Sequence, residues 1–345
     1  MDKEIYTNKK LLIILSFLSL IFLIIISLGI GNINISPKDI LETLINKIIN
    51  RETNYTYEMI IINTRLPRIL LSILVGGILA LSGLVYQTLL KNPLAEPFTL
   101  GVSSSVSFGI ALGIFISDFF LKTRISLFPF AFITGFIATI LLFHFAMGHN
   151  VSLFTLIFFG ISCQYFFNAF LTLLLSLLGD RSYEVLMWTF GTFANPPKTI
   201  YIIIFYTVSI FAFVYIFFQN KKLDLFYLSD DIVKSSGIEP NKTRKIILFI
   251  ASILTITSVS ICGIIGFIGL IVPHLSRLIF GNRHKFLIPA TIILGASIIL
   301  ISDNIARSFV GMFTEYGKEL PIGVVTSILG TPLFLYFLIK NKKRG

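Results

Sequence analysis

Two arginines in the segment RLPRILLSILVGG, residues 65–77, have the type and spacing to bind carboxylates. Arg65 and Arg68 stand three positions apart, so on a helix both side chains lie on one face. A guanidinium group presents a planar fork of N–H donors that matches a carboxylate in bidentate fashion. Pro67 suits the first turn of a helix, where its missing N–H costs little, so we expect a helix to begin here. The alternative is that both arginines simply reach the lipid headgroups from a helix end.

A third arginine, Arg307, follows an acid by four residues in the segment GASIILISDNIAR. An Asp four positions before an Arg is a favourable pair on a helix. The simplest interpretation is therefore that Asp303 holds and orients Arg307. Glu96 is the other acid near an apolar segment, and it lies in NPLAEP, where prolines interrupt the helical pattern.

The composition determines what kind of element positions these side chains. The chain has 345 residues, of which 55% are hydrophobic and only 13% are charged, and its mean hydropathy is +0.89. These values lie outside the range of soluble globular domains. The net charge of +11 comes from short basic tracts between apolar runs, which anionic headgroups explain better than nucleic acid does. We therefore predict a polytopic membrane protein, all α-helical, with residues 1–345 in a single transmembrane domain.

Apolar runs of about 20 residues, each long enough to cross the hydrocarbon core as a helix, recur along the chain. The expected spans are 11–30, 65–90, 98–117, 125–147, 151–178, 199–218, 246–262, 264–280, 286–307 and 320–340. The least secure division lies around CGIIGFIGLIVPHLSRLIFG, where glycines and Pro273 are compatible with a short span, a broken helix or a re-entrant segment.

Basic residues orient these ten spans. With this count both termini share one side, and 17 of the 28 lysines and arginines fall on that side against 11 on the other. Because positive charge marks the cytoplasmic side, both termini are expected inside, with a short N-terminus at 1–10 and the largest inner loop at 219–245. Arg65, Arg68 and Arg307 then lie on the outer face, against the charge bias.

Small residues on the second expected span predict close helix packing. Gly76, Ala80 and Gly83 occupy positions i, i+4 and i+7 in the segment GGILALSG. One stripe of this helix therefore lets another backbone approach.

Several absent motifs narrow the class of function. The chain contains no G-x-x-x-x-G-K-[ST] nucleotide loop, no H-E-x-x-H and no G-x-S-x-G, so it lacks a visible means of hydrolysing ATP or of acyl chemistry. We predict no catalytic residue and no metal site. Transport would then be energised by a partner or by an ion gradient. The second alternative, an ion-coupled secondary transporter, requires acids near the bilayer midplane, and few candidates exist.

The inner loop 219–245 is the most informative polar stretch. Leu225, Leu228, Ile232 and Val233 recur at helical spacing before Gly237 and Pro240 end the pattern. We expect one short amphipathic helix followed by a turn. The alternatives are a solvated connection lying on the headgroups and a docking helix for a cytoplasmic partner.

Four stretches of the sequence resemble a known family. They are RLPRILLSILVGGILALSGLVYQTLLKNPLAEPFTLGVSSS, CGIIGFIGLIVPHLSRLIFGNRHKFLIP, GASIILISDNIAR and ELPIGVVTSILGTPLFLYFLIK. In this order they resemble the permease subunits of bacterial ABC importers for ferric siderophores, haem and vitamin B12, which are type II importers.

The resemblance implies a set of partners. Two copies of the permease would form a homodimer in the bacterial cytoplasmic (inner) membrane, surrounded by membrane lipids, with a pore along their interface. Each copy would rest on a cytoplasmic ABC ATPase subunit that uses ATP and Mg²⁺, while this chain itself binds no cofactor and is no enzyme. An extracytoplasmic binding protein would deliver the metal-chelate substrate.

The resemblance also implies roles for individual residues. Arg65, Arg68 and Arg307 match arginines that receive carboxylates of the binding protein, and Asn92, Pro93 and Leu94 match the cytoplasmic gate. The ATPase-coupling segment matches residues 228–238, and the residues expected to carry that role are Leu228, Asp230, Asp231, Lys234 and Gly237.

The coupling segment departs from the family pattern at three positions. Ser229, Val233 and Ser236 stand where Gly, Ala and Leu are common. Because the ATPase surface that contacts these positions should carry complementary changes, we expect the three departures to affect which ATPase the chain binds. His274 and Arg277 in PHLSR match family residues that we expect to give structural support near the inner face.

Overall fold

The computed structural model describes residues 2–31, 33–96, 98, 101–146, 153–194, 196–309 and 319–342. These residues form helices joined by short loops, and no strand occurs among them. The longer helices are α1 (Asp2–Gly29), α4 (Leu66–Leu89), α5 (Val102–Ile116), α6 (Phe128–Ala146), α7 (Leu153–Leu178), α9 (Thr199–Phe218), α12 (Pro240–Cys262), α13 (Ile268–Phe280), α14 (His284–Ser308) and α15 (Ile322–Lys342).

Each of the ten expected apolar spans corresponds to one of these helices. Eight helical segments of the described chain are long and apolar enough to cross a membrane, and two shorter apolar helices accompany them at Ile268–Phe280 and Ile322–Tyr336. The segment around Pro273 is therefore a short helix, α13, that begins after a break. The count of ten transmembrane helices stays a prediction because these two segments are short.

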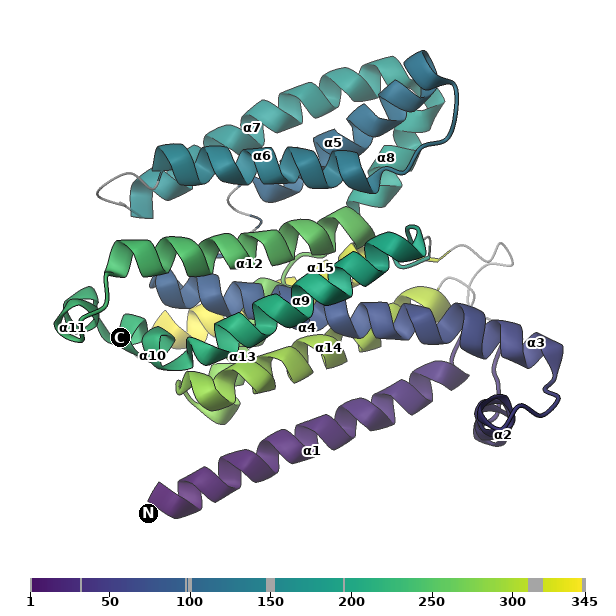
Figure 1. The fold of residues 1–345 in the computed structure, drawn as a ribbon, viewed down its shortest axis with the longest axis horizontal. Helices are drawn as coiled ribbons and strands as arrows, with labels where there is room; N and C mark the ends of the chain where they lie inside the picture. Colours follow the sequence, from purple (N-terminus) through teal and green to yellow (C-terminus); the bar gives the residue numbers. More distant parts are fainter. Residues whose placement is uncertain are drawn as a thin grey trace.

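The remaining helices are short and lie mostly at the ends of the bundle. They are α2 (Pro37–Ile48), α3 (Tyr55–Glu58), the π-helical η1 (Met59–Arg65), the π-helical η3 (Ser117–Leu121), the 3₁₀ turn η4 (Gly179–Arg181), α8 (Ser182–Thr189), α10 (Asn220–Leu228) and α11 (Asp230–Ser235). The start of α1, the end of α15, α10 and α11 lie at one end of the bundle, and α2, α3 and α8 lie at the other (Figure 1). We call these the inner end and the outer end, following the expected orientation.

Helix α4 forms the centre of the fold. It packs against α12, α13 and α14, while α5, α6 and α7 pack on one another and reach the rest of the bundle where α5 and α6 contact α12 (Figure 1). A Cβ added at Gly83 would stand 1.9 Å from the carbonyl oxygen of Gly269 in α13, and one added at Gly76 would stand 2.5 Å from that of Gly295 in α14. The predicted stripe of small residues is thus confirmed, since both neighbouring backbones touch α4 there.

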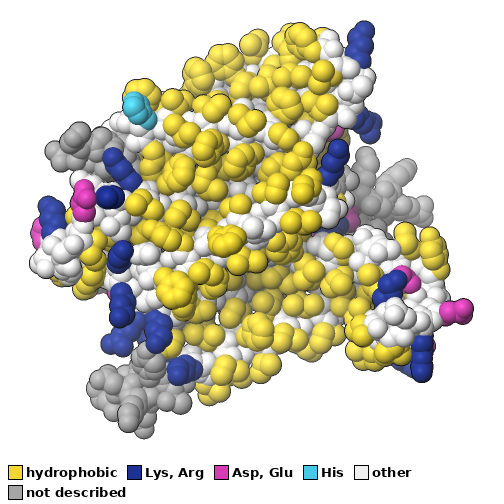
Figure 2. Space-filling view, in the orientation of Figure 1, with side chains coloured by type: hydrophobic (Ala, Val, Ile, Leu, Met, Phe, Trp, Pro, Cys, Tyr) yellow, Lys and Arg dark blue, Asp and Glu magenta, His cyan; other side chains and the backbone are white. Residues whose placement is uncertain are grey.

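The surface follows the requirements of a bilayer. Hydrophobic side chains cover the middle of the visible face, and charged side chains gather at its two ends (Figure 2). Helix α9 is an example of this apolar surface, since its Phe211 is 72% exposed and its Phe218 is 74% exposed. Such side chains at this exposure suit contact with lipid or with another protein.

One expected helix start is wrong. The helix that contains Arg65 and Arg68 begins after Asn54, whose side chain accepts hydrogen bonds from the backbone N–H groups of Thr56 and Tyr57. Helix α3, the π-helical turns of η1 and α4 then run without interruption as one 35-residue segment. Pro67 has no N–H to donate to the preceding turn. The π-helical turn before it, with its longer i→i+5 hydrogen bonds, accommodates the missing bond so that the helix continues.

Candidate functional site

The three arginines of the outer end come together in one cluster. Their guanidinium groups are bonded to groups of the protein itself and are not free to receive a partner. Arg65 is 5% exposed. It donates from Nη1 to the carbonyl oxygens of Leu28 at 2.6 Å and Gly29 at 3.1 Å, and from Nη2 to that of Ile33. These carbonyls lie at and just beyond the C-terminus of α1, where a cation is favoured by the helix dipole. Arg65 therefore anchors the end of α1.

Arg68 holds two acids of the outer end. Its Nη2 lies 2.8 Å from Oδ1 of Asp303, and its Nη1 lies 2.7 Å from Oε2 of Glu319. The Asp303 side chain is 0% exposed and that of Arg68 is 10% exposed, whereas that of Glu319 is 27% exposed. The pair between Arg68 and Glu319 is thus the part of the cluster that solvent reaches.

Arg307 completes the cluster from α14. Its Nε lies 3.4 Å from Oδ2 of Asp303, so the expected helical pair is present. Its Nη2 also donates to the side chain of Asn304 and to the Ser27 hydroxyl at 2.9 Å. Sequence reasoning did not identify Ser27 or Glu319 as site residues. Glu319 opens the stretch ELPIGVVT, but each of the two meets its partner only across the fold.

The inner end contains a second network, built on α10 and α11. Ser229 separates these helices, since its extended backbone and its hydroxyl, which accepts from Ile232 N–H, begin α11. The expectation of one amphipathic helix is therefore wrong. The apolar residues of the pattern divide between two environments, because Val233 is buried whereas Leu228 is 63% exposed and Ile232 is 39% exposed.

Asp230 joins this helix pair to the inner end of α4. Both of its carboxylate oxygens accept from Nη2 of Arg244 at 2.8 Å, and Oδ1 also lies 2.8 Å from Nζ of Lys91. Arg244 in turn donates from Nε to the carbonyl oxygen of Leu89 at 3.1 Å. Burial raises the pKa of Asp230, but the hydrogen bonds and charges of Arg244 and Lys91 outweigh it, so the net shift is downward.

A parallel connection runs from α10. Oδ1 of Asp224 accepts from the backbone N–H of His284 at 2.8 Å and lies 2.6 Å from Nδ1 of the same ring. Nε2 of His284 lies 3.0 Å from the Thr88 hydroxyl of α4. Arg277 then donates from Nη1 to the Gln87 side chain at 2.5 Å. The expected supporting role of Arg277 near the inner face agrees with this contact.

The predicted gate residues follow α4 directly. Oδ1 of Asn92 accepts from the backbone N–H of Leu94 at 2.9 Å, and the carbonyl oxygen of Asn92 accepts from Ala95 N–H at 3.0 Å. Pro93 is exposed and Leu94 is 45% exposed. The turn begins at Asn92, directly after Lys91, so the ion pair of Asp230 with Lys91 lies next to the turn.

The other predicted coupling residues lie on the outside of α11. Asp231, Lys234 and Gly237 are exposed, as are Leu228 and Ile232. Gly237 has φ +76°, the left-handed conformation that favours glycine after a helix. We call these five exposed residues the expected coupling face.

No group of three or more His, Cys, Asp or Glu side chains that could hold a metal ion occurs within the described part of the chain. The side chains of the outer arginine cluster and of the inner network are engaged in ion pairs and hydrogen bonds between helices. Their arrangement suits the transmission of force and contact with partners.

Comparison with known proteins agrees with this arrangement. The model of the FecCD transport family matches residues 19–340. The molybdate import system permease protein MolB of Haemophilus influenzae is 34% identical, over 95% of this chain and 95% of its own. The iron(3+)-hydroxamate import system permease protein FhuG of Bacillus subtilis is 31% identical, over 97% of this chain and 98% of its own.

A solved structure resembles the whole fold. It is an inward-facing conformation of a metal-chelate type ABC transporter, with a TM-score of 0.79 and 30% identity, and the match covers 96% of this chain and 99% of that one.

Proposed function

Because the chain belongs to the FecCD transport family, we propose that it is the permease subunit of an ATP-driven importer that moves a metal chelate across the cytoplasmic membrane. It is a multi-pass protein of that membrane. Two copies form the pathway, a cytoplasmic ATPase on each copy supplies the energy, and an extracytoplasmic binding protein delivers the cargo.

The observation that carries this proposal is the pair of connections from α10 and α11 to the inner end of α4. The coupling face offers two exposed apolar side chains, Leu228 and Ile232, which suit the surface of a cytoplasmic partner. Behind it, Asp230 is bonded to Lys91 at the start of the gate turn. A displacement of α11 therefore moves the turn that contains Asn92, Pro93 and Leu94.

The mechanism follows from this linkage. ATP binding draws the two ATPases together and shifts both copies of α10 and α11, and the shift is passed on through Asp230 and Asp224 to α4. The permease then changes between two alternative packings, and hydrolysis resets it. Leu94, which is 45% exposed, meets its counterpart from the second copy when the pathway is closed.

Docking of the binding protein takes place at the outer arginine cluster. Arg68 is the arginine that reaches solvent, through its pair with the partly exposed Glu319. A carboxylate of the binding protein displaces Glu319 and takes its place on the guanidinium fork. Arg65 and Arg307 hold the end of α1 and the end of α14 behind it, so all three arginines take part.

Transport in proteoliposomes tests the function. The chain is reconstituted with its cognate ATPase and binding protein, and uptake of the binding protein's ligand is measured with and without ATP. We expect uptake to require ATP hydrolysis and to survive an ionophore. Uptake that persists without ATP but collapses with the ionophore would contradict the proposal and favour an ion-coupled secondary transporter.

The cargo is tested separately. Ferric siderophores, haem and cobalamin are the proposed chelates. Two relatives of the chain are named for different cargoes, molybdate and iron(3+)-hydroxamate, so both kinds of cargo are tested. Titration of the cognate binding protein with each chelate and with molybdate measures which one binds. Tight binding of molybdate alone would overturn the chelate assignment and leave the importer assignment in place.

Docking is tested at Arg68 with two conservative variants. Glu319→Gln frees the outer part of the guanidinium group, so we expect several-fold tighter binding of the binding protein in a pull-down or interferometry experiment. Arg68→Lys keeps the charge but loses the fork, so we expect weaker binding. Unchanged affinity in both variants, with unchanged melting temperatures, would remove the arginine cluster from the docking surface.

A further inference from the structure

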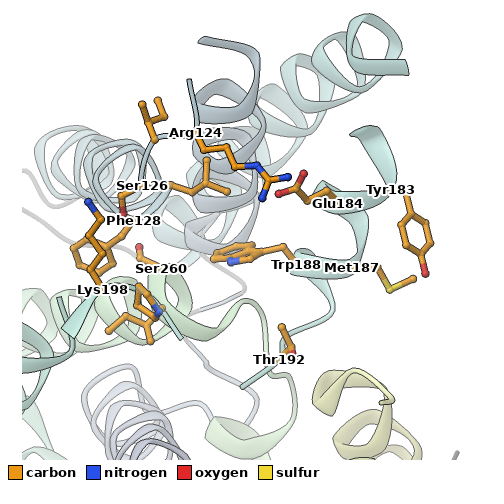
Figure 3. Close-up of a pocket in the computed structure, with 14 residues that line it drawn as sticks. Arg124, Ser126, Phe128, Tyr183, Glu184, Met187, Trp188, Thr192, Lys198 and Ser260 are labelled. Carbon is orange, nitrogen blue, oxygen red and sulfur yellow. The ribbon is translucent and has the colours of Figure 1, made fainter. Parts of the chain in front are cut away.

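A cavity of about 580 Å³ lies at the outer end, away from the arginine cluster. This open cavity is bordered by the loop before α6, by α8, by the segment that leads into α9 and by the last turn of α12 (Figure 3). Neither the proposed docking surface nor the coupling face uses it. Its lining combines aromatic rings with two cations, Arg124 and Lys198.

The charges of this cavity favour an anion. Arg124 and Lys198 are exposed, and within the described ranges no ion pair or hydrogen bond engages either side chain. The one lining carboxylate, Glu184, lies toward Arg124 in Figure 3. Glu184 is bonded to Arg181 at 2.8 Å, and Arg181 also pairs with Asp118. The three cations Arg124, Lys198 and Arg181 therefore stand against two carboxylates in and beside the cavity. The lining thus retains positive charge for a ligand.

A buried hydroxyl points to the same conclusion. Ser260 lies in the last turn of α12 and is 3% exposed. Its Oγ is buried and has no hydrogen-bond partner among the described residues, and the side chain lines the cavity (Figure 3). A buried hydroxyl without a partner costs about 1–3 kcal/mol, and an acceptor oxygen in the cavity removes this cost.

An apolar groove of about 660 Å³ continues along the same two helices, α9 and α12. Its lining includes Phe211 and Phe218 of α9 and Phe249 and Ile253 of α12. Ile253 and Phe249 precede Ser260 by seven and eleven residues, spacings that return to the same face of a helix. The groove therefore begins about 10 Å below the hydroxyl on that face of α12.

We propose that an anionic glycerophospholipid binds here, with its phosphate in the cavity and an acyl chain in the groove. The phosphate accepts from Ser260 and lies between Arg124 and Lys198. Trp188, in the cavity wall (Figure 3), belongs to the class of side chain that lies at the headgroup level of membranes. A soluble chelate would occupy the charged cavity but leaves the groove unexplained, and only a lipid matches both.

Lipid binding to the purified chain in detergent tests this proposal. The probes are phosphatidylglycerol, phosphatidylcholine with the same acyl chains, and inorganic phosphate, measured by native mass spectrometry and by the shift of the melting temperature. We expect phosphatidylglycerol to bind at least fivefold more tightly than phosphatidylcholine, and inorganic phosphate to have no effect at the same concentration. The Arg124→Ala/Lys198→Ala variant should lose this preference, and Ser260→Ala should weaken binding by a smaller factor.

The matched control is Lys38→Ala/Arg51→Ala, which removes two exposed cations of the outer end that do not line the cavity. It should retain the preference. Equal binding of both lipids to the wild-type chain, or the same loss of preference in the control, would overturn the proposal. An equal stabilisation by inorganic phosphate would overturn the assignment to a lipid. To test the groove, Ile253→Trp fills it and should weaken phosphatidylglycerol binding without changing the charge.

Discussion

The outer and inner ends of this protein both contain arginine–carboxylate networks, but the two networks differ in exposure. At the outer end the side chains of Asp303 and Arg307 are 0% and 6% exposed. At the inner end those of Lys91 and Asp230 are 41% and 38% exposed. Buried pairs are costly to break because one partner is left uncompensated, whereas exposed pairs contribute up to about 1 kcal/mol.

This difference matches the work proposed for each end. The outer network closes α1, α4 and α14 into one unit, and only the Arg68–Glu319 pair is open to exchange. At the inner end the Lys91–Asp230 pair can form and break at small cost, as a coupling element that cycles must do, while the Arg244 and His284 side chains behind it are 10% and 0% exposed. Each prediction below changes one of these regions or the helix seam that lies between them.

The largest effect is expected at Asp303. Asp303→Ala removes the buried carboxylate shared by Arg68 and Arg307, so that Arg68 keeps only Glu319 and Arg307 loses its ion pair. We expect a loss of about 3–5 kcal/mol in the free energy of unfolding, measured in lipid nanodiscs or bicelles. Asp231→Ala, at an exposed position of α11, is the control and should change little. A wild-type stability for Asp303→Ala would show that the outer network is not structural.

A smaller loss is expected at the seam of α4. In Gly83→Ala the new methyl group would stand 1.9 Å from the carbonyl oxygen of Gly269, so α4 and α13 must separate. Overpacking of this kind costs about 1–3 kcal/mol, which a lower melting temperature reports. Gly266→Ala is the matched control, since an added Cβ there meets nothing within 4 Å. Equal melting temperatures for both variants would contradict the close packing of these helices.

Asp230→Asn is expected to affect coupling more than stability. The substitution weakens the contacts with Lys91 and Arg244 at a half-exposed site, so stability should fall by less than about 1 kcal/mol. The number of cargo molecules imported per ATP hydrolysed should fall several-fold in proteoliposomes with the partner subunits. Asp231→Asn provides the comparison on the same helix. A coupling ratio equal to that of the wild type would mean that the inner network does not transmit the motion.

The smallest effect is a pH dependence at Glu96, next to the gate turn. Burial raises the pKa of Glu96 from its ordinary 4.5 to about 7. The folded state therefore binds this proton more tightly than the unfolded state, so stability falls as pH rises from 4.5 toward 7 and then levels off. Glu96→Gln should flatten this part of the curve of melting temperature against pH. Parallel curves for the variant and the wild type would exclude Glu96 as the source.

Sequence reasoning located the helices but not the contacts between their ends. The ten apolar segments and the small-residue stripe of α4 were predicted correctly, because hydropathy and helical spacing are local properties. The start of the second span was misplaced by about ten residues because Asn54 and the π-helical turn before Pro67 are weak signals. The loop with Ser229 was read as one helix because a serine N-cap within an apolar pattern is easily missed.

The site residues show the same division. The sequence by itself determined that Arg65, Arg68 and Arg307 belong to one end of the molecule, since the spans and the charge count place all three on one side. Only the tertiary structure decided what each binds. Arg68 and Asp303 are 235 residues apart in the sequence. Arg65 bonds to Leu28 and Gly29, which precede it by 37 and 36 residues. Side-chain partners at such separations depend on how helices pack, and that packing is a property of the whole chain.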